Sequence, residues 1–373
     1  MLYIYYTFYI IFSLYSILIL LFTKGFYNLK TTQKLKNSNT LFSVIIPFRN
    51  ESKNLERLLN SIAEIRYPKN KFEIIFVDDD SKDNSVEIIR DFCKENKLTN
   101  ITIINNKRAS NSPKKDAIKT AIGVAKYNWI VTTDADCILP EKWLISFSSL
   151  IQKVNPNMIV APVKISGNSY FLEQFQKVDF LSMQGATIGG FGIKIPFMAN
   201  GANLAYKKEL FFELSGFNDN DFIASGDDIF LLENFLNYNK NKVHFLKTTN
   251  ALVTTFAVKS WQDLIQQRKR WAAKTTHFKS NITKCIGVIV FLANFATIST
   301  LPLIFTDRYI IFFLGFKFCV DAFLIFKTAR FYKQRIPFLM YLKIIFFHPF
   351  FTAYIAIASI SSTFVWKERS FRK

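Results

Sequence analysis

Two aspartates separated by one residue, Asp134 and Asp136, have the types and spacing in this chain that most directly suggest chemistry. They follow the β-prone run 129–133, so they stand where a buried strand is expected to end. Carboxylates are the hard oxygen ligands that Mg²⁺ and Mn²⁺ prefer, and Mg²⁺ is usually held by one or two carboxylates together with substrate phosphates. The pair therefore suggests a metal and diphosphate site. A purely structural alternative is that Asp136 caps the helix predicted over 141–153.

Two further acidic groups stand at comparable places. Asp78, Asp79 and Asp80 follow the predicted strand 73–77, and Asp227 and Asp228 precede the predicted helix 229–237. Carboxylates at a helix start are favoured by the helix dipole, which is the structural alternative for the second group. The carboxyl ends of parallel strands lie at one edge of a sheet. Helix capping alone does not readily explain why two strand ends at that edge, at 78–80 and 134–136, are acidic.

The elements that must position these acids alternate along the chain. Runs 41–48, 73–77, 101–104 and 129–133 read as strands, with helical patterns between them. This alternation predicts an α/β fold with a doubly wound, mostly parallel sheet. Farther on, we expect a strand at 158–165, a helix at 170–185, a loop at 189–196 and a strand pair at 243–246 and 251–256. No P-loop or dinucleotide glycine spacing is present, which disfavours a nicotinamide or flavin enzyme.

The two ends of the chain are apolar enough for a membrane. Leu2 to Phe22 contains no charged residue and has the length of a transmembrane helix. A cleaved signal peptide is disfavoured because there is no basic region before it and no small-residue cleavage site. The predicted organisation is a transmembrane helix at 1–23, a linker at 24–40, an α/β domain at 41–282 and a membrane region at 283–373. Lysines directly after the first helix place the α/β domain in the cytoplasm by the positive-inside rule.

The region 283–373 is expected to hold two to three transmembrane or re-entrant segments. Lys317 and Asp321 are spaced to pair on one helix face. A full crossing by 337–366 would put the basic C-terminal residues outside, against the positive-inside rule. An interfacial helix followed by a re-entrant segment or short hairpin would keep them inside, and the residues alone leave both arrangements open.

The net charge and the spacing of the cysteines indicate which kinds of binding partner, disulfide and metal site are disfavoured. With 48 Lys and Arg against 28 Asp and Glu, the net charge is +20. The lysines are scattered among apolar residues without a nucleic-acid-binding pattern, so a basic surface facing anionic lipid is the better interpretation. The four cysteines show no disulfide or zinc spacing.

Four motifs stand in order along residues 41–272: SVIIPFRNE with VDDDS, then TTDAD, then SGDD, then QQRKRW. Together they resemble the membrane-bound family 2 glycosyltransferases, which include cellulose, hyaluronan and poly-N-acetylglucosamine synthases and ceramide glucosyltransferases. The resemblance implies a GT-A fold for 41–282, flanked by transmembrane helices.

The resemblance also implies roles for individual residues. Asp228 would be the general base, and Asp136 the main metal ligand for Mg²⁺ or Mn²⁺. The nucleotide-sugar would be bound by a set of residues near the first strands: Pro47, Arg49, Glu51, Asp79, Lys114 and Asp134. The acceptor and the diphosphate would be contacted by Gln267, Arg270, Trp271 and Asp227. Pro113 stands where the family usually has glycine, so Lys115 is an alternative to Lys114.

The function implied is an inverting transfer of sugar from a UDP-sugar to a growing polysaccharide, by a multi-pass protein of the cell membrane with its catalytic domain in the cytoplasm. Transfer of a single sugar to a lipid such as ceramide or diacylglycerol is the alternative. A non-catalytic membrane subunit is a remote alternative, since it would not need the acidic pairs. The expected partners are the nucleotide-sugar, a glycan or lipid acceptor and the membrane, with no nucleic acid; partner subunits are not indicated.

Overall fold

A seven-stranded, mostly parallel sheet forms the centre of the computed structural model, which describes residues 2–31, 39–218, 221, 223, 225–359, 364–367 and 369–371. The strand order is β3-β2-β1-β4-β7-β5-β8. The strands are β1 Phe42–Phe48, β2 Phe72–Asp78, β3 Ile101–Asn105, β4 Trp129–Thr132, β5 Met158–Val160, β7 Leu204–Lys207 and β8 Val243–Phe245. The α/β fold with a mostly parallel sheet, predicted from the sequence, is confirmed.

Burial on both faces explains why the first strands are almost wholly apolar. Both neighbours of β1, which are β2 and β4, run parallel to it. Its residues Phe42, Val44 and Ile46 belong to one core cluster, while Ile45 belongs to the other. Helices cover both sides of a parallel sheet, which leaves no polar face for its strands. The helices of this part are α2 Ser52–Ala63, α3 Ser85–Glu95, α4 Pro113–Val124, α5 Trp143–Val154, α7 Lys208–Glu213 and α8 Asp227–Asn239.

The second half of the sheet departs from the sequence prediction. The single strand expected at 158–165 is two strands, β5 and β6 (Val163–Ser166). The segments 243–246 and 251–256 do not pair with each other: β8 pairs with β5, while β9 (Val253–Phe256) pairs with β6 in a separate sheet. Pro162 between β5 and β6 cannot donate a backbone hydrogen bond, which suits a break in the ladder at that point.

A long helix extends into the region where a loop at 189–196 was expected. Helix α6 spans Phe171–Gly192 and packs along the first helix, α1. A Cβ at Gly189 would lie 2.3 Å from the carbonyl oxygen of Phe22, and one at Gly192 would lie 1.8 Å from that of Gly25. These glycines therefore mark a close helix crossing rather than a turn.

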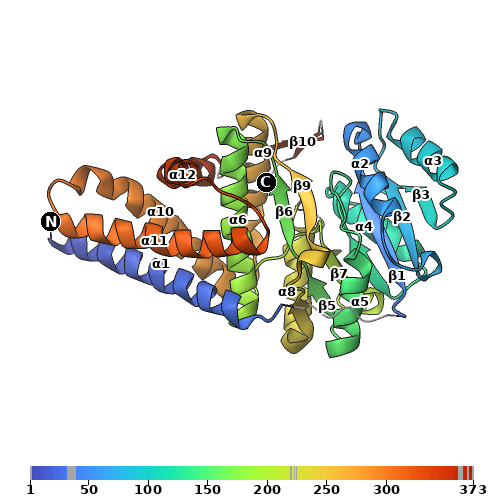
Figure 1. Ribbon diagram of the computed structural model, residues 1–373, viewed down its shortest axis with the longest axis horizontal. Coiled ribbons are helices and arrows are strands. Elements are labelled where there is room, and N and C mark those ends of the chain that lie inside the picture. Colours follow the sequence, from blue (N-terminus) through green and yellow to red (C-terminus); the bar gives the residue numbers. More distant parts are fainter. Residues whose placement is uncertain are drawn as a thin grey trace.

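Four helices in the described part of the chain are long and apolar enough to cross a membrane: α1 Leu2–Asn28, α10 Asn281–Thr300, α11 Arg308–Phe331 and α12 Phe338–Ala358. Helices α1, α10 and α11 run side by side away from the sheet, and the N-terminus lies at their far end (Figure 1). Helix α12 crosses this direction and is seen nearly end-on in the same view. Short 3₁₀ segments are η1 Lys69–Lys71, η3 Lys240–Lys242, η4 Thr249–Ala251, η5 Thr275–His277 and η6 Leu301–Leu303.

The first helix continues to Asn28, beyond the predicted boundary at residue 23. The buried ammonium of Lys247 explains where it ends. It donates hydrogen bonds to the last carbonyl oxygens of the segment, those of Phe26 and Leu29, and lies 4.2 Å from the ring centroid of Phe26. A cation at a helix C-terminus satisfies free carbonyls and is favoured by the dipole. Lys247 thus ties α1 to the α/β part of the chain.

The chain returns to the sheet after α12. Strands β10 (Phe364–Trp366) and β11 (Arg369–Phe371) form an antiparallel pair, which Figure 1 shows beside α9 (Trp261–Ala273). The sequence pattern did not predict this pair of strands because 337–366 reads as one apolar run. Its position on the domain side agrees with the arrangement that keeps the basic C-terminal residues near the α/β domain.

Candidate active site

The strand order brings the acidic strand ends together. Asp79 directly follows β2 and Asp134 lies two residues after β4, and β1 stands between these two parallel strands. Both carboxylates therefore lie at the carboxyl edge of the sheet, where ligands of open α/β sheets bind. Helix α5 begins at Trp143 with Lys142 as its N-cap, so the alternative that Asp136 caps this helix is wrong.

Lys114, in the first turn of α4, joins two of the acidic groups. Its ammonium nitrogen lies 2.7 Å from Oδ1 of Asp134 and 3.2 Å from Oδ2 of Asp227. Burial opposes the positive charge, but the two carboxylates outweigh it and raise the pKa of Lys114 above its ordinary value. Lys114 is thus an internal counter-ion between the ends of β4 and α8.

Lys115 points elsewhere, which separates the two lysines that the sequence left as alternatives. It is buried and donates a hydrogen bond of 3.0 Å to the carbonyl oxygen of Ile223, with its ammonium 4.9 Å from the ring centroid of Phe230. Burial lowers its pKa to about 8. Only Lys114 of the pair lines the cavity described below.

Gly201, before β7, permits the close contact around Lys114. A Cβ at this position would lie 2.7 Å from Oδ2 of Asp227 and 3.2 Å from the ammonium of Lys114. Any larger residue would displace the ion pair or the backbone. Gly201 therefore allows the close approach of Asp227 and Lys114.

Asp136 is surrounded in a way that suits a cation. Burial and the nearby carboxylates of Asp134 and Glu51 raise its pKa to about 6. In the described part of the chain its oxygens meet weak donors, the thiol of Cys137 at 3.5 Å and the hydroxyl of Thr255 at 3.4 Å. Within the described ranges, no three His, Cys, Asp or Glu side chains are grouped as a metal site. Two carboxylates, those of Asp134 and Asp136, suit a divalent ion that completes its shell with phosphate oxygens of a ligand.

Asp227 and Asp228 are the first two residues of α8, after Gly226 in a left-handed conformation with φ of 86°. Oδ1 of Asp228 accepts hydrogen bonds from the ammonium of Lys274 at 3.0 Å and from the backbone of Ile229 at 2.8 Å. Burial alone would raise the pKa of Asp227, but Lys114 and Lys274 lower it. The ammonium groups of Lys114 and Lys274 thus stabilise these two carboxylates, and both carboxylates still line the cavity.

The QQRKRW segment lies on α9 and faces the same space. Gln267, Arg270 and Trp271 all line the cavity. Burial lowers the pKa of Arg270, and the charges opposing that shift are the carboxylates of Asp227, Asp134, Asp228 and Asp136. A guanidinium can hold a phosphate group through two parallel hydrogen bonds, so Arg270 is a candidate for such a contact in this cavity.

The predicted nucleotide-binding residues gather at the ends of β1 and β2. Arg49 follows β1, which contains Pro47, and donates to the carbonyl oxygen of Asp79 at 2.6 Å. Glu51 is buried at the start of α2, and its Oε2 accepts a hydrogen bond from Asn54 at 2.7 Å. These residues do not line the cavity that contains Asp134, Asp136, Asp227 and Asp228, although Glu51 is close enough to affect Asp136.

The hairpin β10–β11 brings two cations onto the predicted nucleotide-binding residues, which the sequence pattern did not reveal. Lys367 pairs with Glu51, and Arg369 pairs with Asp79. Both carboxylates belong to the predicted nucleotide set. Lys367 and Arg369 therefore contact two of the predicted nucleotide-binding residues as well as following the candidate membrane helix α12.

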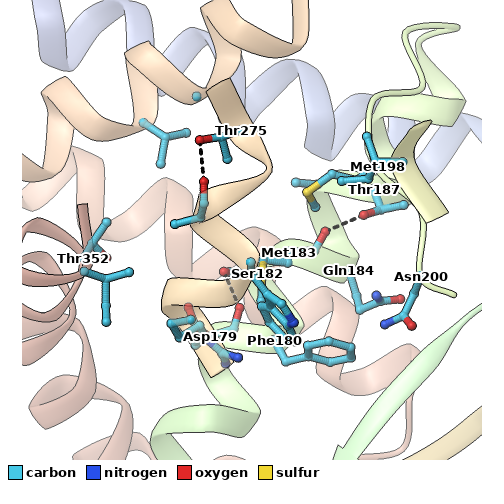
Figure 2. Close-up of a pocket in the computed structure, with 18 of the residues that line it drawn as sticks. Asp179, Phe180, Ser182, Met183, Gln184, Thr187, Met198, Asn200, Thr275 and Thr352 are labelled. Atoms are coloured by element: carbon cyan, nitrogen blue, oxygen red, sulfur yellow. Dashed lines mark hydrogen bonds and ion pairs between the residues drawn. The ribbon is translucent and has the colours of Figure 1, made fainter. Parts of the chain in front are cut away.

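A cavity of ≈ 590 Å³ extends from the acidic groups to the apolar helices. One end is polar and is lined by Lys114, Asp134, Asp136, Asp227, Asp228 and Arg270. The other end is mostly apolar. Residues of the candidate membrane helices line it, among them Ile19, Phe22, Ile286, Val290, Leu324 and Ile344, and the ion pair of Lys317 with Asp321 is also part of the lining. Figure 2 shows Asp179, Ser182, Met183 and Thr187 along α6, with Thr352 across the space from them.

The chain is similar to known glycosyltransferases. The family profile of Glycosyl transferase family group 2 matches residues 129–360, and that of Glycosyl transferase family 2 matches residues 43–212. The probable glycosyltransferase YdaM of Bacillus subtilis is 26% identical over 343 residues, which cover 88% of this chain and 76% of YdaM. The poly-β-1,6-N-acetyl-D-glucosamine synthase of Staphylococcus epidermidis is 27% identical over 145 residues, which cover 38% of this chain and only 33% of the synthase.

A solved structure supports the fold. The mannosyltransferase PcManGT of Pyrobaculum calidifontis, in complex with GDP-Man and Mn²⁺, superposes with a TM-score of 0.58 at 18% identity. The superposition covers 87% of this chain and 97% of PcManGT. At this identity the likeness concerns the α/β architecture alone.

Proposed function

The chain belongs to glycosyl transferase family 2 and is a glycosyltransferase, and on that basis we propose that it moves one sugar from a nucleotide-sugar to a hydroxyl group of a lipid acceptor at the cytoplasmic face of the membrane. The observation that carries the acceptor is the two-ended cavity. Its polar end holds the acids, and its apolar end lies among helices of membrane-crossing length. An amphiphile with a hydroxyl head complements both ends.

The donor is proposed to bind along the carboxyl edge of the sheet. Arg49, Glu51 and Asp79 hold the nucleoside, while Lys114 and Arg270 hold the diphosphate. Ion pairs between guanidinium or ammonium groups and phosphate are strong where the site is buried. A UDP-sugar stays the prediction from the motifs; the GDP-Man in the PcManGT complex makes GDP-sugars the natural comparison.

Asp134 and Asp136 fit a divalent ion shared with the donor. An Mg²⁺ or Mn²⁺ ion there would supply Lewis-acid stabilisation to the departing diphosphate. The protein side chains provide the rest: the cationic groups of Lys114 and Arg270 balance the charge that develops on the leaving group.

Asp228 is proposed as the general base. The acceptor hydroxyl gives its proton to the Asp228 carboxylate while its oxygen forms a bond to the sugar C1. The bond from C1 to the phosphate oxygen breaks, and the nucleoside diphosphate leaves with the electron pair. Attack from the face opposite the leaving group inverts the configuration at C1. General-base catalysis of this kind contributes roughly 10²–10⁴-fold in rate.

The orientation in the membrane is proposed from the helix arrangement. Helices α1, α10 and α11 would cross the bilayer, with the N-terminus on the far side and the α/β domain in the cytoplasm (Figure 1). Helix α12 crosses their direction and leads back to the domain through the β10–β11 hairpin, so it would lie in the cytoplasmic leaflet. Exposed apolar side chains along it, including Leu339, Phe346 and Ile357, suit contact with lipid.

A radiolabelled donor panel tests the proposal. Purified protein in mixed micelles receives UDP- or GDP-sugars with dioleoylglycerol or ceramide, and the products are separated by solvent extraction and chromatography. Metal-dependent formation of a monoglycosylated lipid is expected, and chelation with EDTA should abolish it until Mn²⁺ is added back. A polymer formed without added lipid would overturn the lipid acceptor and favour the polysaccharide expected from the sequence. No transfer from any donor would contradict the proposal.

A further inference from the structure

A buried charged cluster connects three helices beside the proposed acceptor cavity. Asp179 on α6 accepts hydrogen bonds from Nε and a terminal nitrogen of Arg268 on α9, at 3.0 and 2.7 Å. The other oxygen of Asp179 lies 3.1 Å from Nε2 of His348 on α12. The motif resemblance assigns none of these three residues a role, and all three line the cavity. Figure 2 shows Asp179 on the wall formed by α6.

Arg268 also holds two residues of the motif on its own helix. Its second terminal nitrogen lies 2.6 Å from Oε1 of Gln267, and its guanidinium lies 4.1 Å from the ring centroid of Trp271. A guanidinium only donates hydrogen bonds, so it fixes the carbonyl end of the Gln267 amide toward itself. The amide nitrogen of Gln267 is then the end that remains for a ligand in the cavity.

Only a forked side chain can make these contacts together. The guanidinium is planar and presents five N–H donors, which here reach a carboxylate and an amide while its plane meets an aromatic ring. Burial opposes the charge of Asp179, but Arg268 and His348 lower its pKa to about 2, so the carboxylate remains ionised across the physiological range. Burying an ion pair brings little net stability compared with apolar packing. A positioning role explains better than stability why charges lie here.

We infer that Asp179, Arg268 and His348 are positioning residues for the acceptor, an inference that rests on the proposed function. Arg268 aims the amide nitrogen of Gln267 at an oxygen of the acceptor head group and fixes the plane of Trp271. Asp179 fixes Arg268. His348 connects this arrangement to α12, the helix that borders the apolar end of the cavity. The helix that contacts the lipid chain is thereby coupled to the residues that contact the head group.

A double-mutant cycle tests the inference. Arg268→Lys keeps a cation for Asp179 but cannot reach Gln267 and Trp271 at the same time. It should lower kcat/KM for the acceptor about 10–100-fold, the scale of a small misplacement of reacting groups. Binding of UDP and the slow hydrolysis of UDP-sugar without acceptor should change by less than about twofold, because the donor contacts are elsewhere. In a Gln267→Ala background, Arg268→Lys should cost at least about threefold less than it does in the wild type, since Gln267, one of the two residues it acts through, is gone.

A second pair of variants tests His348 and includes a matched control for a histidine outside the cavity. His348→Asn should raise the acceptor KM, whereas His244→Asn on the edge strand β8, the same substitution far from the cavity, should leave transfer unchanged. The cycle is measured on the product that the wild-type protein forms from labelled UDP-N-acetylglucosamine with dioleoylglycerol, with ceramide or without lipid. Wild-type polymer in place of lipid product overturns the proposed acceptor but still gives a readable cycle. Additive losses in the cycle, or equal losses of UDP binding and transfer, overturn the positioning role.

Discussion

The ammonium of Lys114 lies 2.7 Å from the carboxylate of Asp134 and forms an ion pair with it. Asp134 is the first of the two aspartates that follow β4. The same nitrogen lies 3.2 Å from the carboxylate of Asp227. Lys114, in the first turn of α4, therefore connects the segment after β4 with the first turn of α8. Gly201 leaves room for this contact. The arrangement gives the proposed site a fixed cation next to the position where a diphosphate would gain charge.

Lys114→Met should lower kcat/KM for the donor by about 10²-fold or more, because the charge that develops on the departing diphosphate loses a preorganised cation. Lys115→Met is the matched control, because that side chain does not line the cavity and donates its hydrogen bond to the carbonyl oxygen of Ile223. Steady-state kinetics with varied donor concentration measures both. Equal losses for the two variants would contradict the assignment of Lys114.

Lys115 gives a stability prediction with a defined pH window. Its pKa is lowered to about 8 in the fold, whereas a lysine in an unfolded chain titrates near about 10.4. Between these values the unfolded chain binds more protons, so folding stability should rise with pH from about 8 to about 10. The Tm of Lys115→Met minus that of the wild type should therefore fall as pH rises from about 7 to about 10. Thermal unfolding in detergent measures the difference, and a constant difference would refute the prediction.

Two glycine-to-alanine substitutions should have opposite effects on stability: one lies at the α1–α6 crossing and the other lies in α4. Gly189→Ala would place a Cβ 2.3 Å from the Phe22 carbonyl oxygen and should cost about 1–3 kcal/mol as an overpacked contact. Gly123→Ala, in α4 with nothing within 4 Å of the added Cβ, should stabilise by about 0.4–1 kcal/mol through the unfolded state. Tm values of both variants in the same detergent check this. A stabilised Gly189→Ala variant would contradict the close crossing.

The proposed topology predicts which positions reagents reach from outside the cell. In a chain whose four cysteines are replaced by serine, Thr306→Cys at the far end of α10 and α11 should react with a membrane-impermeant maleimide on intact cells. Lys333→Cys, after α11 on the domain side, should react only after the cells are opened. The positive-inside rule supports the same orientation. Labelling of Lys333→Cys on intact cells would reverse it.

The strands that carry the acids were predictable because β1, β2 and β4 are short apolar runs ended by polar residues, and the ladder that joins them follows from parallel packing. The contact of Lys317 with Asp321, at 2.9 Å, also followed from helical spacing. Glycine at 189–192 predicted a loop because a helix crossing and a turn both favour glycine, and only the partner α1 decides between them.

Other features depend on contacts that are distant in sequence. Strands β6 and β9 pair although the helices α6, α7 and α8 and the strands β7 and β8 lie between them in the chain, and their local sequence pattern does not indicate a partner. The QQRKRW segment contains two arginines, and nothing in its local pattern sets Arg268 apart. What sets it apart is its hydrogen bond with Asp179, 89 residues earlier in the chain. The hairpin that brings Arg369 to Asp79 is equally remote. Such contacts carry no periodic signal.

The central claim is that Asp228 is the base of a sugar transfer. The most direct measurement compares transfer and UDP binding for Asp228→Asn with those for Asp91→Asn, an exposed position on α3. Asp228→Asn should reduce transfer by roughly 10²–10⁴-fold while UDP binds as in the wild type, and Asp91→Asn should behave as the wild type in both assays. Full turnover by Asp228→Asn would contradict the account.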